Sequence, residues 1–178
     1  AQAEQLKEMI KHVESANTYA LQQSYDSYAQ LGIAAMVKSD ALAKKGELKT
    51  PITMAVENLF PESFGGHPDE LIQLIEKSRA RMVEKLTAEH KMSQEQAKKE
   101  AEEHIFATFD TAHCNMWFKY WKGDPRKTID ENKIEFDKWM LGRVEELAKK
   151  KIVGHLHLVD NYGFEDEHLA PGEGNAPV

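Results

Sequence analysis

The sequence lacks paired cysteines, long apolar runs and a surplus of basic residues. One cysteine, Cys114, stands among 178 residues, so an intrachain disulfide framework is excluded and a reducing, cytoplasmic setting is expected. No apolar run approaches the roughly 20 residues that span a bilayer, so no membrane partner is expected. The formal charge of -7 disfavours nucleic acid, whose phosphates recruit basic surfaces, although a local basic patch stays compatible with it.

Motifs of several common enzyme classes are missing too. There is no GxGxxG after a strand, no Walker-type GK[ST] and no G-x-S-x-G elbow, which disfavours dinucleotide, nucleoside triphosphate and serine-hydrolase chemistry. Cys114 beside His113 could be a nucleophile–base pair, but neighbours on a turn rarely face each other. The chain opens on a helix pattern without an initiator Met or a signal-peptide core, which suggests a truncated or processed protein.

Residues 1 to about 45 contain no proline, and Gly32 is their first glycine. Apolar residues recur near the start at intervals of three and four, at Leu6, Met9, Ile10 and Val13. This spacing predicts a long helix that could bend at Gly32 and that stops at Gly46.

Three short apolar runs further along end abruptly in polar residues: ITMAVEN (52–58), IFATFDTAH (105–113) and KIVGHLHLVDN (151–161). Helix patterns separate them over 68–86, from a Ser93–Gln96 capping box onward, and over 129–150. Strands that alternate with helices predict an α/β domain with parallel strands and right-handed crossovers. The first run is typical of a strand buried on both faces.

Metal ligands or acid–base groups follow each predicted strand. Glu57 ends the first, Asp110 and His113 end the second, and His155 and His157 alternate along the third, so both imidazoles point to one face. Because parallel strands place their carboxyl ends at one edge, these side chains are expected to converge.

Each group also has an ordinary structural interpretation. Glu57 could face solvent, and Asp110 could cap a turn beside a merely polar His113. Asp166 and His168, a D-x-H step in "EDEH", could belong to a solvated acidic loop. Taken together, carboxylates and imidazoles without thiolate favour Zn²⁺, Mn²⁺, Mg²⁺ or Co²⁺.

The stretches "ITMAVENLFPE", "ATFDTAH" and "GHLHLVDN…EDEHLAPGEG" resemble the xylose isomerase-like TIM-barrel (AP endonuclease 2) superfamily. That superfamily includes sugar isomerases, ketose 3-epimerases and endonuclease IV. The resemblance implies a partial (β/α)8 TIM barrel in a single domain. Residues 1–46 would form a long helical segment, and residues 47–178 would hold barrel strands five to seven, with the eighth strand missing.

The same resemblance implies roles for the site residues. Glu57, Asp110 and His157 match the metal ligands, and Glu57 could double as the base. His113 matches a histidine that touches substrate in the epimerases and binds an additional zinc in endonuclease IV-like members. Asp166 and His168 resemble the D-x-H step of that extra zinc site. His155 has no clear ligand counterpart, and we expect His155 and Asp160 to support the ligands without binding the ion.

The chain departs from the epimerase pattern at defined positions. Gly163 stands where an arginine is usual, Ser63 stands where a second glutamate is usual, and the glutamate of the eighth strand would lie beyond Val178. These departures lead us to expect impaired catalysis in the chain as it stands. Open sheet edges would need cover, and copies of the chain could pair as a homo-oligomer.

Three functions follow from these residues. The first is a divalent-metal sugar isomerase or epimerase that acts on a carbohydrate, with an aromatic wall or a packed core made by Trp117, Phe118, Tyr120 and Trp121. The second is a zinc-dependent, endonuclease IV-like phosphodiesterase on abasic DNA, for which the nearest basic cluster is Lys119, Lys122, Arg126 and Lys127. The third is an inactive metal-binding fragment.

Overall fold

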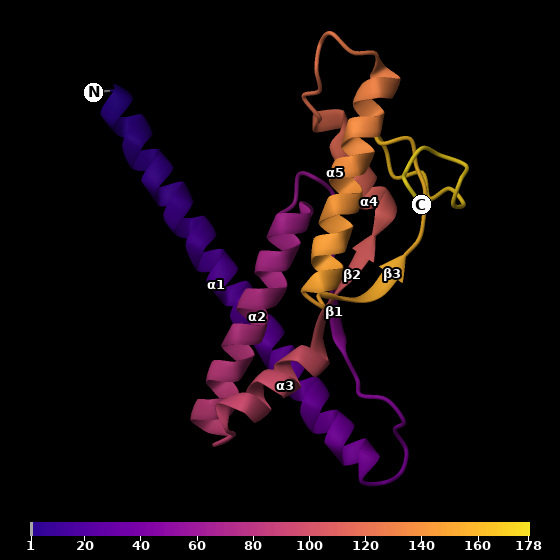
Figure 1. Ribbon diagram of the computed structural model, residues 1–178. Coiled ribbons are helices and arrows are strands. Elements are labelled where there is room, and N and C mark those ends of the chain that lie inside the picture. The colour runs from indigo at the N-terminus through magenta and orange to yellow at the C-terminus, as the bar shows by residue number, and fades with distance from the viewer. Residues whose placement is uncertain (1) are drawn as a thin grey trace. The chain divides into compact units, whose positions relative to one another are not determined.

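The computed structural model describes residues 2–178 and has an α/β fold (Figure 1). Its elements are α1 (Gln2–Ala43), β1 (Met54–Glu57), α2 (Pro68–Glu89), α3 (Gln94–His104), β2 (Ile105–Asp110), α4 (Thr111–Asn115), the 3-10 helix η1 (Met116–Tyr120), α5 (Ile129–Lys149) and β3 (Val153–His157). The chain forms two compact units: one up to Thr53 with Lys77–Ile105, the other from Met54–Glu76 and Phe106–Val178. Within residues 2–178, no helix is both long and apolar enough to cross a membrane.

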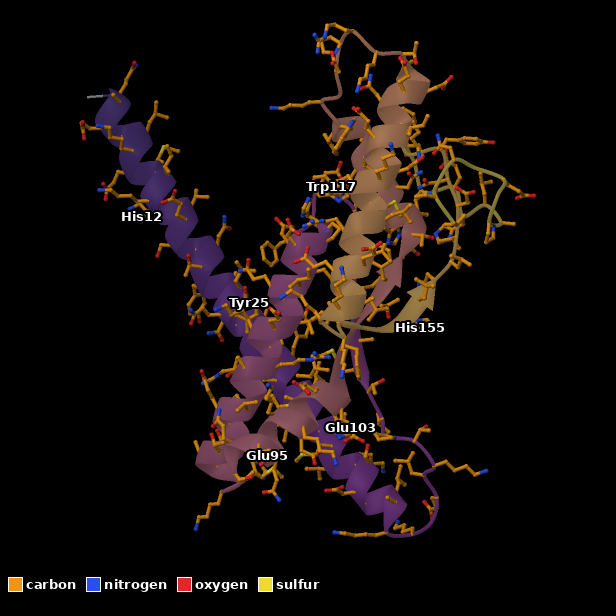
Figure 2. The ribbon with its side chains drawn as sticks, in the orientation of Figure 1. His12, Tyr25, Glu95, Glu103, Trp117 and His155 are labelled. Atoms are coloured by element: carbon orange, nitrogen blue, oxygen red, sulfur yellow. The ribbon has the colours of Figure 1, made fainter. Side chains whose placement is uncertain are left out.

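In the first unit, α1 runs without a break through Gly32, and Gly32 serves close packing. A Cβ at this position would lie 2.7 Å from Ile105 Cγ1 and 2.8 Å from Met82 Sδ. The buried residues of α1 begin only at Ala29, so its first half contributes nothing to this core. Figure 2 shows His12 on that exposed half.

The second unit contains a three-stranded parallel sheet in the order β1-β2-β3. β2 and β3 pair with Thr108 opposite His155 and Asp110 opposite His157. The sequence suggested a first strand buried on both faces, and this is wrong: Ala55 is exposed and the rest of β1 is half-buried. β1 lies at the edge of the sheet, so only one of its sides is paired with a strand.

The helices of the second unit follow the expected patterns with small differences. α5 begins at a Thr128–Glu131 capping box and buries Phe136, Met140 and Leu147, whereas Ile134 is 54% exposed. The apolar run 105–113 is divided in two, because β2 stops at Asp110 and the next residues form α4. Asp110 is therefore the last residue of a strand, and His113 lies in the first turn of the helix that follows.

The capping box of α3 gives a direct test of local stability. Ser93 Oγ accepts from the Gln96 N–H at 3.2 Å, and Gln96 Oε1 accepts in return from the Ser93 N–H at 3.4 Å. We expect Ser93→Ala to lower the free energy of unfolding by about 1 kcal/mol in urea denaturation. Ser93→Asp keeps a capping oxygen and should lose far less; equal losses would contradict a role for the cap.

Candidate metal centre

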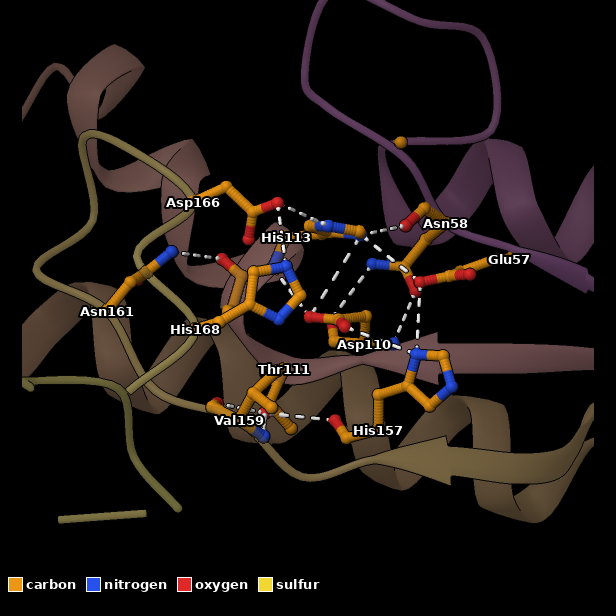
Figure 3. A network of polar contacts seen from close by, with 12 residues as sticks. Glu57, Asn58, Asp110, Thr111, His113, His157, Val159, Asn161, Asp166 and His168 are labelled. Carbon is orange, nitrogen blue, oxygen red and sulfur yellow. Dashed lines mark hydrogen bonds and ion pairs between the residues drawn. The ribbon is translucent and has the colours of Figure 1, made fainter. Parts of the chain in front are cut away.

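The ends of the three strands bring Glu57, Asp110 and His157 together (Figure 3). His157 Nδ1 lies 3.1 Å from Glu57 Oε1 and 3.4 Å from Asp110 Oδ2. Asp110 is buried, while the side chains of Glu57 and His157 are 32% and 41% exposed. The three side chains therefore converge, as the parallel strand order predicted, and the cluster has a buried carboxylate at its base and an accessible side.

Asn58, which the sequence reasoning missed, fixes Asp110 in this position. Its side chain is fully buried, donates to the Asp110 carbonyl at 3.0 Å and accepts from the Asp110 N–H at 2.7 Å. The amide therefore joins β1 to β2 beyond the last residue of the strand. An asparagine directly after a strand-end glutamate was the available signal.

Thr111 makes the corresponding connection to the third strand end. Its Oγ1 donates to the Val159 carbonyl at 2.5 Å and accepts from the Val159 N–H at 3.0 Å. It also lies 3.2 Å from the carbonyl of His157. The backbone beyond His157 is thereby held against the end of β2.

Asp110 uses its two oxygens differently. Oδ1 accepts from the His113 N–H at 3.0 Å and caps α4, so the ordinary interpretation of this residue holds for one oxygen. Oδ2 is buried and has no hydrogen-bond partner, and it faces His157 Nδ1. A buried carboxylate oxygen without a donor is costly, and a cation would satisfy it.

His113 lies beside this cluster but faces a second one. Its Nδ1 is 2.8 Å from the carbonyl oxygen of Asn58. A carbonyl only accepts, so Nδ1 carries a proton, and the lone pair of the neutral ring is on Nε2. By distance alone Glu57 and Asp110 also group with His113, but they approach its protonated Nδ1, at 3.5 and 4.0 Å. His157 Nδ1 lies closer to the same two carboxylates, so His157 is the better third ligand of their cluster.

Nε2 of His113 points at the second group, which contains Asp166 and His168. Asp166 Oδ2 lies 3.4 Å from His113 Nε2 and 3.1 Å from His168 Nε2. In the neutral ring, His113 Nε2 and Asp166 Oδ2 are two acceptors that face each other. A cation between them removes this repulsion, and the buried, unpartnered Asp166 Oδ1 points to the same need.

Two of the three distances between ligand atoms in each group suit a small divalent ion. Ligand atoms about 2.0–2.1 Å from a tetrahedral Zn²⁺ lie about 3.3 Å from each other. The nitrogen–oxygen distances in the two groups are 3.1 and 3.4 Å in each case. Each group offers three protein ligands, so a fourth position is left for water or substrate, as in catalytic zinc sites.

No family model, curated protein or solved structure matches this chain.

The loop that carries Asp166 and His168 is held by two buried residues. Asn161 donates to the carbonyls of Ala112 at 2.9 Å and Glu165 at 2.8 Å. Asp160 accepts from four backbone N–H groups at 2.8–2.9 Å: those of Asn161, Gly172, Gly174 and Ala176. Asp160, expected to support the ligands, folds the "PGEG" loop that follows them.

His155 lies next to the centre without completing either group. Its ring centroid is 4.9 Å from that of His157, and its Nδ1 is 3.5 Å from Thr108 Oγ1. The two imidazoles therefore share one face of the sheet, as their alternation predicted. His155 is exposed and lies outside both ligand groups.

Cys114 is unsuited to nucleophilic chemistry. The thiol is fully buried, and burial, together with the negative charge of Asp110, raises its pKa to about 12. A thiol with this pKa carries almost no thiolate at neutral pH. A His113–Cys114 nucleophile pair is therefore wrong for this fold.

The aromatic residues after β2 form a packed cluster with α5. Phe118 and Trp121 place their ring centroids 5.4 and 5.6 Å from that of Phe136. Trp117 Nε1 instead donates to the Gly66 carbonyl at 3.1 Å. The ring beside the ligands is Phe60, which is 41% exposed, with its centroid 5.1 Å from that of His113; the sequence reasoning missed it.

The two groups predict separable metal binding. Elemental analysis after loading with Zn²⁺ should give about two ions per chain. Glu57→Ala/His157→Ala and Asp166→Ala/His168→Ala should each lose about one, because each pair removes two of three ligands. His155→Ala, the matched control, should keep both. Equal stoichiometry in all four proteins would contradict the assignment.

Asp160 predicts a pH-dependent contribution to stability. Burial alone would raise its pKa, but the hydrogen bonds from Ala176, Gly174, Gly172 and Asn161 outweigh burial and lower the pKa below the ordinary 3.8. A lowered pKa in the folded state stabilises the fold above about pH 4, and the contribution is lost as the pH falls through the folded value.

We therefore expect Asp160→Asn to lower the free energy of unfolding at pH 7 by roughly 1.5–3 kcal/mol, the usual worth of hydrogen bonds to a charged group. The difference from the wild type should shrink as the pH falls below 3.8. Urea denaturation between neutral and acidic pH measures it. Glu165→Gln is the control, because it removes the same negative charge from an exposed residue of the same loop. A constant difference at all pH values would contradict this account.

Proposed function

We propose that this protein is part of a divalent-metal-dependent sugar isomerase or epimerase of the xylose isomerase-like superfamily. The observation that carries the proposal is the convergence of Glu57, Asp110 and His157 at the ends of three adjacent strands. In this proposal β1, β2 and β3 are strands five to seven of a TIM barrel, and the protein acts in the cytoplasm.

An ion held there would polarise the carbonyl of a carbohydrate and stabilise an enediolate. Glu57 is placed to move the proton that this reaction requires. Its carboxylate is partly exposed, and Oε1 is 3.1 Å from His157 Nδ1. It would take the proton from the carbon next to the carbonyl. The proton returns to the neighbouring carbon in an isomerase, or to the other face of the same carbon in an epimerase.

His113 and Phe60 would position the sugar. With Nδ1–H bonded to Asn58, Nε2 of a neutral His113 can accept a hydrogen bond from a substrate hydroxyl when it holds no ion. The exposed Phe60 ring beside it offers an apolar face to the C–H side of a sugar. Gly163 and Ser63, which replace an arginine and a glutamate of the epimerases, point to a different arrangement of substrate contacts.

The basic cluster supports a neutral substrate over nucleic acid. Lys119 pairs with Glu62 at 2.9 Å, Arg126 pairs with Asp124 at 2.8 Å, and Lys127 pairs with Glu135. Acidic partners therefore offset most of the positive charge that could bind phosphates. The formal charge of -7 acts in the same direction.

The second candidate is a zinc-dependent phosphodiesterase on abasic DNA, and one observation favours it. His113, Asp166 and His168 form a second ligand group next to the first. Two ions in neighbouring sites can stabilise the attacking and the leaving oxygen of a phosphodiester. An inactive metal-binding fragment is the third interpretation.

Proton exchange tests the first candidate. The chain loaded with Mn²⁺ or Zn²⁺ should catalyse hydrogen–deuterium exchange in D2O at the carbon next to the carbonyl of a ketose substrate. NMR measures the rate of this exchange. Glu57→Gln keeps the size of the side chain but removes the base, and should slow exchange by about 10²–10⁴-fold. Exchange that is unaffected by this change would rule out Glu57 as the base.

An oligonucleotide with one abasic site tests the second candidate. Cleavage that requires Asp166 and His168 and weakens steeply with added salt would favour the phosphodiesterase. Metal binding without deuterium exchange or cleavage would favour the inactive fragment.

A further inference from the structure

The first half of α1 presents a long helical surface that nothing in its unit covers. Every residue from 2 to 20 is helical and exposed, over about 28 Å at 1.5 Å per residue. Isolated helices of this length are marginal in water, because few of their residues bury apolar surface. A partner that covers this surface would stabilise it.

The exposed surface includes an ordered apolar row. Its large members are exposed by 56–63% and recur at steps of three, one and three residues: Leu6, Met9, Ile10 and Val13. The same helix face continues with smaller side chains: Ala16, Asn17 and Ala20. The row, here named the 6–20 stripe, is therefore bulky and apolar at its N-terminal end and thin at its C-terminal end, where Asn17 is its one polar member.

The opposite face of the same segment is charged and largely paired within the helix. Lys7 lies 3.3 Å from Glu4, and Lys11 lies 3.5 Å from Glu8. Counting Glu14, residues 2–20 have one net negative charge, so two such segments repel each other weakly. The segment thus has an apolar side suited to helix packing and a polar side suited to water.

We propose that the 6–20 stripe docks a second copy of itself in antiparallel orientation. Antiparallel pairing sets Leu6 and Ile10 of one copy against Ala20 and Ala16 of the other, so the thickness of the interface is even along its length. Parallel pairing would set bulky residues against each other at one end and alanines at the other, which leaves a gap beside the alanines. Antiparallel helices also place opposite dipole ends side by side.

Asn17 adds a polar contact that differs between the two orientations. In the antiparallel pair it lies opposite Met9, whose flexible side chain can pack beside the amide while the amide reaches water at the edge of the contact. In a parallel pair the two copies of Asn17 would face each other and could hydrogen-bond. The contacts of Asn17 therefore do not decide the orientation by themselves.

Val13 lies at the centre of the stripe, so in the antiparallel pair the two copies of Val13 lie close to the twofold axis. A glutamate there would put two like charges close together in an apolar contact. Val13 is 60% exposed in the single chain, so the substitution does not disturb the core of the fold. Ser15, on the charged face, provides a matched control for the same substitution.

Sedimentation equilibrium of the full chain tests the proposal. We expect a mass of about twice 20.3 kDa for the wild type and for Ser15→Glu. Val13→Glu should raise the dimer dissociation constant at least about tenfold, a change of 1.4 kcal/mol. A monomeric wild type would overturn the proposal and assign the stripe to a different partner. A dimer that Val13→Glu leaves intact would overturn it as well.

Disulfide trapping tests the orientation. Leu6→Cys mixed with Ala20→Cys should cross-link between the two variants much faster than either variant cross-links with itself. The native Cys114 does not interfere, since it is buried and its pKa is raised to about 12. Faster self-cross-linking of each variant would show a parallel pair and overturn the antiparallel arrangement.

Discussion

The hydrogen bonds of one buried residue, Asn58, hold the candidate centre together. Its side chain bonds both backbone groups of Asp110, and its own N–H donates to the Thr108 carbonyl at 3.3 Å. Its carbonyl accepts a hydrogen bond from His113 Nδ1–H. The position of Asp110 and the tautomer of His113 therefore depend on the same residue.

The fixed tautomer divides six ligand candidates into two groups. Because His113 turns Nε2 away from Glu57 and Asp110, it serves Asp166 and His168, and His157 completes the first group. Each group contains a buried carboxylate oxygen without a donor. Buried negative charge with so few donors is stable only when a proton or a cation balances it. A divalent ion in each group could supply that balance.

The C-terminal segment reaches the centre through a loop rather than through regular structure. Asp160 accepts hydrogen bonds from the backbone N–H groups of Gly172, Gly174 and Ala176. Asn161 donates to the carbonyl of Ala112 in α4 and to that of Glu165 beside Asp166. Hydrogen bonds to an ionised acceptor are roughly twice as strong as bonds between neutral groups, so several of them hold the loop in place. Asp166 can therefore contribute to the site from outside the sheet.

The sequence by itself located the long helices and the strands, and it named the residues that meet at the strand ends. Apolar periodicity located every long helix, abrupt polar ends located the strands, and residue alternation placed His155 and His157 on one face, because local spacing fixes these features. It overestimated the burial of the first strand, since burial depends on the neighbours of an edge strand and not on its own pattern. Contacts between distant residues were decided by the tertiary structure alone. These contacts include the hydrogen bonds between Asn58 and Asp110, the division of the ligand candidates by the His113 tautomer, and the hydrogen bonds of Asp160 in the loop. Each joins groups that are far apart in the sequence, so sequence spacing could not predict it.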